Sequence, residues 1–307
     1  MSLSPEVLVD APAAPKSGFR WLHLNLADQR TLRWLADSAG LPPYVVELLS
    51  ASEGQPRYQI ADGSFCAILS DICKEFETDE VEVGTIRIYL GENIIISARN
   101  HPVRCADGVR ARLLSGVRPT DAASALEILF SAMSEVHRTA AAAVEDTVLE
   151  METDFLKDQP PPSAKLFLNL RSNLARFRRV LSNMRILVQR LDDEPLLPAP
   201  LITPLTRFAS RISTIEADVT SIHGQLRRLR EDVDLEANQK TNENLYMLSI
   251  LSALLLPATL VTGIFGMNTG GFPWASHPFG TLYAIVVAGA ASIAVYILLR
   301  LFGYLQR

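Results

Sequence analysis

The distribution of apolar and charged positions divides this chain near residue 244. Lys, Arg, Asp and Glu are all absent from Asn244 through Leu299, whereas they recur throughout the preceding part. Two apolar stretches lie in this interval, residues 245–265 and 281–299, and each approaches the roughly 20 residues with which a helix crosses a bilayer core. The pattern predicts two transmembrane helices, and two buried core helices are the alternative.

Between Phe19 and Asn100, apolar and polar residues alternate over short stretches, as in β-strands. "FRWLHLNL" reads as a strand, and "QRTLRWLADSAG" as a helix that ends at Gly40. Turn residues interrupt two further alternating stretches, at Asp62-Gly63 and at Gly91–Asn93, and each interruption predicts a β-hairpin.

After Pro119 the pattern becomes helical. It predicts helices over residues 120–156 and 163–192, separated by the breaker "QPPPS", and a third over residues 203–265. A helix of roughly 60 residues would be about 90 Å long, so it must project well beyond the membrane. Its cytoplasmic part has apolar residues at spacings of three and four, typical of a helix packed against partners: Ile212, Ile215, Val219, Ile222, Leu226, Leu229 and Val233.

These patterns predict an α+β cytoplasmic domain followed by long stalk helices and two C-terminal transmembrane helices. The expected segments are an α/β lobe (1–119), a helical region (120–200), the stalk part of the long helix (201–244), transmembrane helix 1 (245–265), an outward loop (266–280), transmembrane helix 2 (281–299) and a tail (300–307).

Basic residues flank both apolar stretches, and none lies between them. They are Arg227, Arg228, Arg230 and Lys240 before the first, and Arg300 and Arg307 after the second. The positive-inside rule therefore places both termini in the cytoplasm. Residues 1–20 lack the apolar core of a signal peptide, so we expect the first 240-odd residues to stay on the cytoplasmic side, where they are made. The expected protein is a multi-pass protein of the plasma (inner) membrane.

Composition excludes several other classes. The net charge of −5 gives no nucleic-acid signature, and an arginine-rich helical stretch, "LRSNLARFRRVLSNMR", suits salt bridges between subunits better than nucleic acid. Cys66, Cys73 and Cys105 lack the CxxC spacing of metal or redox sites and read as reduced thiols. No Walker A, GxSxG or HExxH motif occurs, so we expect no enzyme.

The turn between the two apolar stretches carries a distinctive motif. "GMN", Gly266, Met267 and Asn268, follows "NQKTNENLYML" and "LPATLVTGIF" and precedes a short loop, a second span and a basic tail. This arrangement resembles the CorA family of divalent-cation transporters. "GMNTGGFP" resembles its ZntB branch, the zinc transporters, because Trp274 stands where magnesium-type members commonly have a carboxylate. The resemblance implies a homopentameric funnel with the first span lining a central pore.

Symmetry gives the motif its chemistry. In a ring of subunits each inward residue is repeated, so Asn268 would present a ring of amide oxygens. Such oxygens accept hydrogen bonds from the water of a hydrated cation without the strong binding of a carboxylate ring. Gly266, Gly270 and Gly271 would allow close backbone approach. The alternative is that Asn268 merely ends the helix.

Stepping back from Asn268 by three and four residues selects one helix face. It contains Gly263, Thr259, Leu256, Ser252, Ser249 and Leu245 in the membrane, and Asn242, Asn238 and Glu231 in a cytoplasmic vestibule. Hydroxyls would line the path, and Leu256 and Leu245 could exclude water. Alternatively, Ser249, Ser252 and Thr259 simply bond to helix carbonyls.

The metal itself is less clearly specified. This face has no Cys or His, the ligands that Zn²⁺ prefers, so passage of a hydrated ion is expected, with Asn268 acting through hydration water and His277 as a second candidate contact. We expect no resident cofactor and partners limited to lipid, metal ions and copies of this chain. Zinc is the first hypothesis for the cargo, a magnesium or cobalt channel (with nickel also possible) the second, and a membrane-anchored coiled-coil sensor without transport the third.

Overall fold

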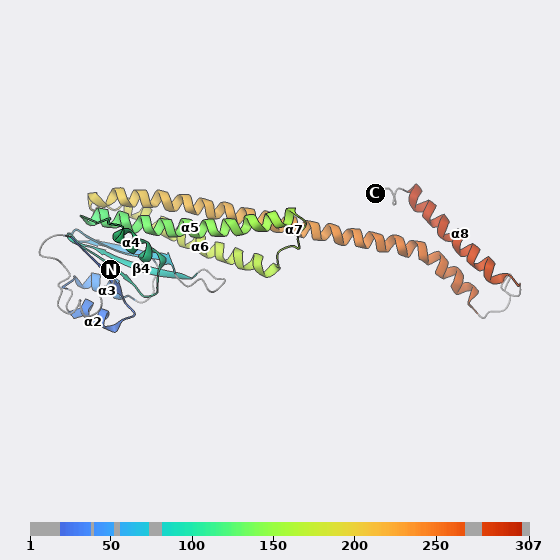
Figure 1. Cartoon of the computed structure of the whole chain (residues 1–307), viewed down its shortest axis with the longest axis horizontal. Helices are drawn as coiled ribbons and strands as arrows, with labels where there is room; N and C mark the ends of the chain where they lie inside the picture. The colour runs from blue at the N-terminus through green and yellow to red at the C-terminus, as the bar shows by residue number, and fades with distance from the viewer. Residues whose placement is uncertain (1–18, 38–39, 52–55, 74–81, 268–277, 303–307) are drawn as a thin grey trace. The chain divides into compact units, whose positions relative to one another are not determined.

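The computed structural model describes residues 19–37, 40–51, 56–73, 82–267 and 278–302. The chain forms two compact units, Met1–Arg230 and Glu231–Arg307. One helix, α7, belongs to both units, because it runs without interruption from Ala199 to Phe265 (Figure 1).

A five-stranded sheet organises the first unit. Its strands are β1 (Arg20–Asn25), β2 (Arg57–Ala61), β3 (Ser64–Ile72), β4 (Val83–Leu90) and β5 (Ile94–Arg99), in the spatial order β1-β5-β4-β3-β2. Both predicted hairpins are confirmed, since β2 pairs with β3 and β4 with β5 in antiparallel fashion. Asp62 and Gly63 both have positive φ, as a two-residue hairpin turn requires. The parallel pairing of β1 with β5 was not predicted.

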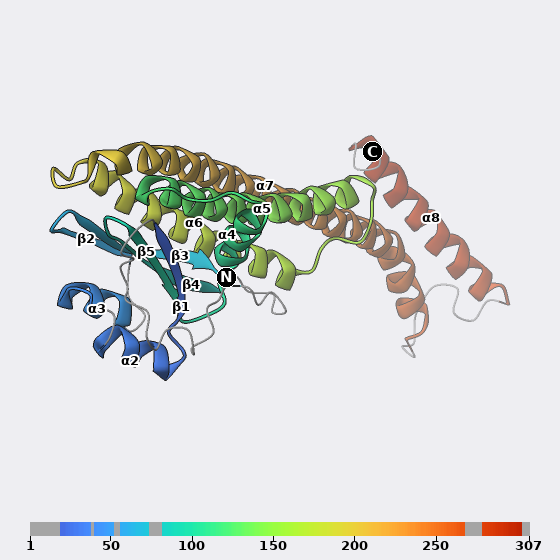
Figure 2. The ribbon, with the colours of Figure 1, turned by 60° about the vertical axis from the view of Figure 1, so that its left-hand side comes forward.

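Two short helices, α2 (Gln29–Asp37) and α3 (Pro43–Ser50), cover one face of the sheet. Figure 2 shows them on the opposite side from the long helices. Their apolar residues and those of the strands form a core that includes Leu22, Leu35, Leu49, Ile68 and Ile96. The expected helix ending at Gly40 is α2, whereas α3 is a helix that we did not expect. Pro43 at its first position is compatible with a helix start, because a residue there needs no N–H to make an intrahelical hydrogen bond and proline has none.

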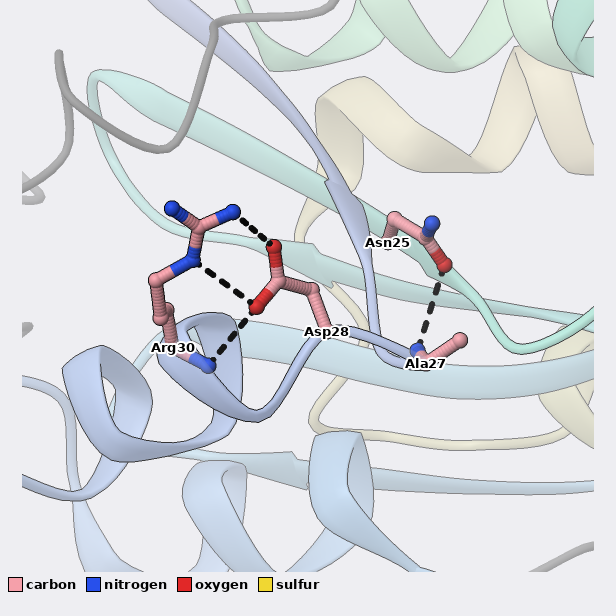
Figure 3. Close-up of polar contacts among 4 residues, drawn as sticks. All are labelled: Asn25, Ala27, Asp28 and Arg30. Carbon is pink, nitrogen blue, oxygen red and sulfur yellow. Dashed lines mark hydrogen bonds and ion pairs between the residues drawn. The ribbon is translucent and has the colours of Figure 1, made fainter.

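The turn from β1 into α2 is fixed by two side chains (Figure 3). Asn25 accepts from the Ala27 backbone N–H at 3.2 Å, and Asp28 accepts from the Arg30 backbone N–H at 2.9 Å. Asp28 also accepts two hydrogen bonds from the Arg30 guanidinium, which hold the pKa of its carboxyl below its usual value. These local bonds start α2 directly after the strand.

Helices cover the other face of the sheet. They are α4 (Arg104–Leu114), α5 (Ala122–Leu156), α6 (Ala164–Asp192) and the first part of α7. The predicted helices over residues 120–156 and 163–192 are confirmed. Their N-caps are Asp121 and Ser163, whose side chains accept hydrogen bonds from backbone N–H groups of the first turn. α4 was not predicted. α7 begins at Ala199 rather than near Thr203, because Pro200 lies in the first turn, where proline is tolerated.

Polar and aromatic contacts join the three long helices. The rings of Phe130 (α5) and Phe208 (α7) stack with centroids 4.1 Å apart, and Arg185 (α6) bonds to Glu216 (α7) at 2.6 Å. Most of the predicted stripe on α7 is buried, from Ile212 to Leu229, while Val233 is part-buried in the second unit. The first unit therefore contains a helical layer packed on a sheet.

The second unit contains the rest of α7 and α8 (Gly280–Leu301). Both helices contain a window apolar enough to cross a membrane, with mean hydropathy 2.1 in α7 and 2.4 in α8. None of the α7 window and only 11% of the α8 window is buried within the chain. Core helices of a soluble protein would be mostly buried, so the alternative of two core helices is not supported.

Candidate ion pathway

The predicted pathway face lies on the part of α7 in the second unit. Leu245, Ser249, Ser252, Leu256, Thr259 and Gly263 are all exposed. At about 100° per residue, these six positions fall within about 40° of a common direction. Leu245 is 56% and Leu256 67% exposed, so neither large apolar side chain has a partner that buries it within its own chain.

The second apolar helix covers the other side of α7. Ser292 of α8 donates its hydroxyl to the Leu254 carbonyl at 2.9 Å, and Ala284 and Ala288 of α8 are buried. The part-buried residues of α7 centre about 150° around the helix from the pathway face. They are Ile250, Ala253, Leu254, Pro257, Ala258, Val261, Ile264 and Phe265. α8 thus leaves the pathway face open.

Hydroxyl groups on this face bond to the helix that carries them. Ser249 Oγ donates to the Leu245 carbonyl at 2.8 Å, and Thr259 Oγ1 lies 3.0 Å from the Leu255 carbonyl and 2.9 Å from that of Leu256. The alternative expectation, that these hydroxyls bond to helix carbonyls, is confirmed for both residues. Each hydroxyl has one hydrogen and two lone pairs, so the internal bond uses the donor and leaves the oxygen able to accept. Such an oxygen can accept a hydrogen bond from the O–H group of a water molecule bound to a cation.

The end of α7 contains the first two residues of the glycine-methionine-asparagine motif. Gly266 N–H donates to the Thr262 carbonyl at 2.9 Å, and Met267 N–H donates to the Ile264 carbonyl at 3.2 Å. A Cβ at Gly266 would lie only 3.1 Å from the Thr262 carbonyl oxygen, so glycine suits this tight helix end. Asn268 and His277 lie outside the described residues, as do Gly270, Gly271 and Trp274.

Gly263 differs from Gly266. A Cβ there would meet nothing within 4 Å, so no packing in the chain requires glycine. Glycine in a helix interior costs about 1 kcal/mol relative to alanine. Gly263 lies in the last turn of α7, and a small residue on an exposed face of a membrane helix is a feature of positions where other helices approach closely.

The cytoplasmic vestibule candidates continue the same direction along α7. Glu231, Asn238 and Asn242 are exposed, and Glu236 forms an ion pair with Lys240 one turn along.

The described residues contain no group of three or more His, Cys, Asp and Glu side chains that could hold a metal. Cys66, Cys73 and Cys105 are buried and are not joined in disulfides, and burial raises the pKa of Cys66 to about 12. They therefore fit the expected reduced thiols.

Two further groups of charged residues lie outside the pathway face. The stretch Glu75–Glu82 connects β3 to β4, and all but its last residue lies outside the described part. On α7, Arg207 and Arg211 both pair with Glu127 of α5, at 3.9 and 3.2 Å.

Comparison with protein families gives one match over most of the chain. A family model described as CorA-like Mg2+ transporter protein matches residues 16–301. A zinc transport protein ZntB of Klebsiella pneumoniae subsp. pneumoniae is 28% identical over 281 residues, covering 88% of this chain and 85% of the relative. A protein of the same name from an Enterobacter species is 26% identical over the same shares.

Solved structures show the same fold at lower identity. The CorA magnesium transporter of Methanocaldococcus jannaschii superposes with a TM-score of 0.81 at 15% identity, covering 95% of this chain and 93% of that one. The full-length CmaX protein gives a TM-score of 0.76 at 21% identity, covering 95% and 90%. These matches extend over both units.

Proposed function

The chain belongs to the family of CorA-like Mg2+ transporter proteins, membrane proteins that transport divalent cations, and we propose that this member conducts zinc through the central pore of a homopentamer. The single observation that carries the proposal is the exposed face of α7 in the second unit. α8 covers the opposite side, and two spans in one chain cannot enclose a path, so copies must assemble around an axis.

Assembly accounts for features that one chain leaves unexplained. Leu245 and Leu256 would form two apolar rings that exclude water until the pore widens. Ser249, Ser252 and Thr259 would form rings of hydroxyl oxygens between and beyond them. Gly263 would let the helices approach near the axis. A membrane-anchored sensor without transport has no use for this alternation, so we rank that alternative lower.

The Gly266–Asn268 motif would form the outer entrance. Asn268 amides, repeated around the axis, would accept hydrogen bonds from the water shell of the ion, with Gly266 and Met267 setting the position of the ring. Glu231, Asn238 and Asn242 would line the inner vestibule, and His277 would be a weaker outer contact. Outer-shell capture suits ions that lose water reluctantly.

We rank zinc above magnesium or cobalt as the transported ion because of the names of the relatives and the residues that follow the motif. The two relatives named above are zinc transport proteins, and the motif is followed by "TGGFPW" without a carboxylate. A magnesium or cobalt channel remains the second candidate, since the family model is described by magnesium.

The decisive experiment measures metal uptake by vesicles that contain the purified full chain. Asn268→Ala should reduce zinc uptake at least about tenfold while leaving the oligomer intact by size-exclusion chromatography, because it removes the ring of acceptors. Asn183→Ala, an exposed asparagine of α6, is the matched control and should transport normally. Uptake by Asn268→Ala at the unmutated rate would refute the filter.

Metal preference needs a competition in the same vesicles. Zinc uptake that persists in a hundredfold excess of magnesium supports the zinc proposal, and magnesium uptake with little zinc uptake supports the second candidate. No uptake of any divalent ion by well-assembled protein would favour the sensor alternative.

We also propose a plasma (inner) membrane location with both termini in the cytoplasm. The flanking basic residues support it through the positive-inside rule. A cysteine introduced by Ser276→Cys should react with an impermeant reagent from outside intact cells, and one introduced by Gln306→Cys should not. The reverse pattern would invert the topology.

A further inference from the structure

A pocket of about 190 Å³ lies in the first unit, between the β1–β5 edge of the sheet and α4. Its floor is apolar and consists of Ile86, Val109, Leu113 and Leu129. Its wall is polar, formed by the side chains that β1 and β5 direct to this face of the sheet: Trp21, His23, Ser97 and Arg99. For scale, a cavity of about 150 Å³ holds benzene.

Donor and acceptor can be assigned for the hydrogen bonds of the wall, because one of them begins at an arginine. Arg99 Nε donates to His23 Nε2 at 3.2 Å, and a guanidinium can only donate, so His23 Nε2 carries no proton. His23 Nδ1 therefore carries the proton and donates to Ser97 Oγ at 2.9 Å. Trp21 Nε1 donates to the same oxygen at 2.9 Å, and the Ser97 hydroxyl faces the Leu22 carbonyl at 3.4 Å.

This arrangement keeps the imidazole neutral and the guanidinium charged. Burial, followed by the neighbouring Arg99, lowers the pKa of His23 to about 4, so the positive charge of the wall at neutral pH belongs to Arg99. His23 uses only the Nε of Arg99, which fixes the plane of the guanidinium. Within the described part of the chain, the two terminal nitrogens of Arg99 have no hydrogen-bond or ion-pair partner.

The rim adds one charge of each sign. Arg110 and Asp107, both exposed residues of α4, lie at the pocket. With Arg99 the three charges give the pocket a net positive charge, which favours an anion.

We propose that this pocket binds a small organic anion, a carboxylate on a compact apolar body. The terminal nitrogens of Arg99 form a fork that matches a carboxylate, and the apolar floor accepts the body of the ligand. The hydrogen bonds of Trp21 and His23 to Ser97 are sufficient to stabilise the sheet. They do not explain why a half-buried guanidinium, held by a neutral imidazole, lies beside an apolar cavity. This proposal is independent of metal transport.

Benzoate is the probe, because its ring suits the floor and its carboxylate suits Arg99. Titration calorimetry on the full chain in detergent should show benzoate binding at least about tenfold more tightly than benzamide, its uncharged counterpart. Inorganic phosphate should bind more weakly than benzoate, since it has no apolar body. Equal affinities for benzoate and benzamide, or no benzoate binding at millimolar concentration, would overturn the proposal. Phosphate binding more tightly than benzoate would overturn the claim that the ligand has an apolar body.

Variants locate the site. Arg99→Gln should weaken benzoate binding at least about tenfold, whereas Arg118→Gln, an exposed arginine of the same unit that does not line the pocket, should not. If Arg99→Gln fails to fold, Ala106→Leu replaces it, because Ala106 lines the pocket, takes no part in the hydrogen bonds of the wall, and a larger side chain there reduces the space for a ligand. Benzoate binding that survives in the folded variant would refute the site.

Discussion

The two halves of α7 are one continuous helix with opposite relations to the rest of the chain. In the first unit, its apolar residues form a single stripe that is buried within the chain: Leu201, Leu205, Phe208, Ile212, Ile215, Val219, Ile222, Leu226 and Leu229. In the second unit, apolar side chains lie all round the helix, and no residue of its most apolar window is buried.

The difference shows how the arrangement of apolar residues around a helix depends on what the helix contacts. A stripe at helical period indicates partners on one side and water on the other. In the second unit the helix carries exposed leucines on its pathway face as well as elsewhere, and these leucines require lipid or other copies of the chain as partners. The fraction of the helix circumference that is apolar, rather than hydrophobicity alone, therefore distinguishes a helix packed within its own chain from one that contacts lipid or other chains.

The largest expected effect tests the buried half. Phe208→Ala removes a fully buried ring that stacks on Phe130, and a truncation of this kind costs about 3–5 kcal/mol. Circular dichroism during heating should show a strong decrease in the apparent Tm of the full chain. Leu256→Ala, in the exposed half, should leave that temperature nearly unchanged, and equal decreases would remove the distinction between the halves.

A second change tests the contact between the apolar helices. Ala288 is 7% exposed on α8, so Ala288→Leu should overpack this contact at a cost of about 1–3 kcal/mol. After incubation at a series of temperatures, the Ala288→Leu protein should lose metal uptake at a lower temperature than the unmutated protein. Ala290→Leu, at an exposed position of the same helix, should have no such effect, because leucine is compatible with lipid. Similar behaviour of the two variants would argue against the observed packing.

A matched pair of threonines tests the pathway face. Thr259 and Thr262 both donate to helix carbonyls and both are exposed, but Thr262 lies about 100° from the centre of the face. Thr259→Val, which keeps the shape and removes the oxygen, should reduce zinc uptake several-fold, whereas Thr262→Val should not. Equal uptake by both variants would mean that the hydroxyls serve only the helix.

The smallest expected effect concerns a surface ion pair of the first unit. Arg211 is 40% exposed in its side chain and lies 3.2 Å from Glu127, so Arg211→Gln should cost about 1 kcal/mol or less. The decrease in apparent Tm should shrink further in 1 M salt because exposed charges are screened. A large decrease that persists in salt would instead indicate that this pair is needed for packing of α5 on α7.

Local patterns predicted a large part of the fold. The Asp62-Gly63 turn, the break between the helices over residues 120–156 and 163–192, and the stripe on α7 each depend on residues close in sequence, and the corresponding elements are present. α3 and α4 were missed because both are short, and α4 has a weak apolar pattern. The pathway residues could be predicted as one helix face, but Asn268 and His277 lie outside the described part, and their roles remain proposals.

The sequence by itself determined α2, the long helices, the two hairpins, the uncharged C-terminal pair and the family, because each follows from neighbouring residues or from a motif. Only the tertiary structure decided the pairing of β1 with β5 and the face of α7 that α8 covers, since both depend on contacts between distant segments. The same holds for the pocket at Arg99. The alternation in "RWLHLN" puts Trp21 and His23 on one side of a strand, but their common contact with Ser97, more than 70 residues away, exists only once the sheet has formed.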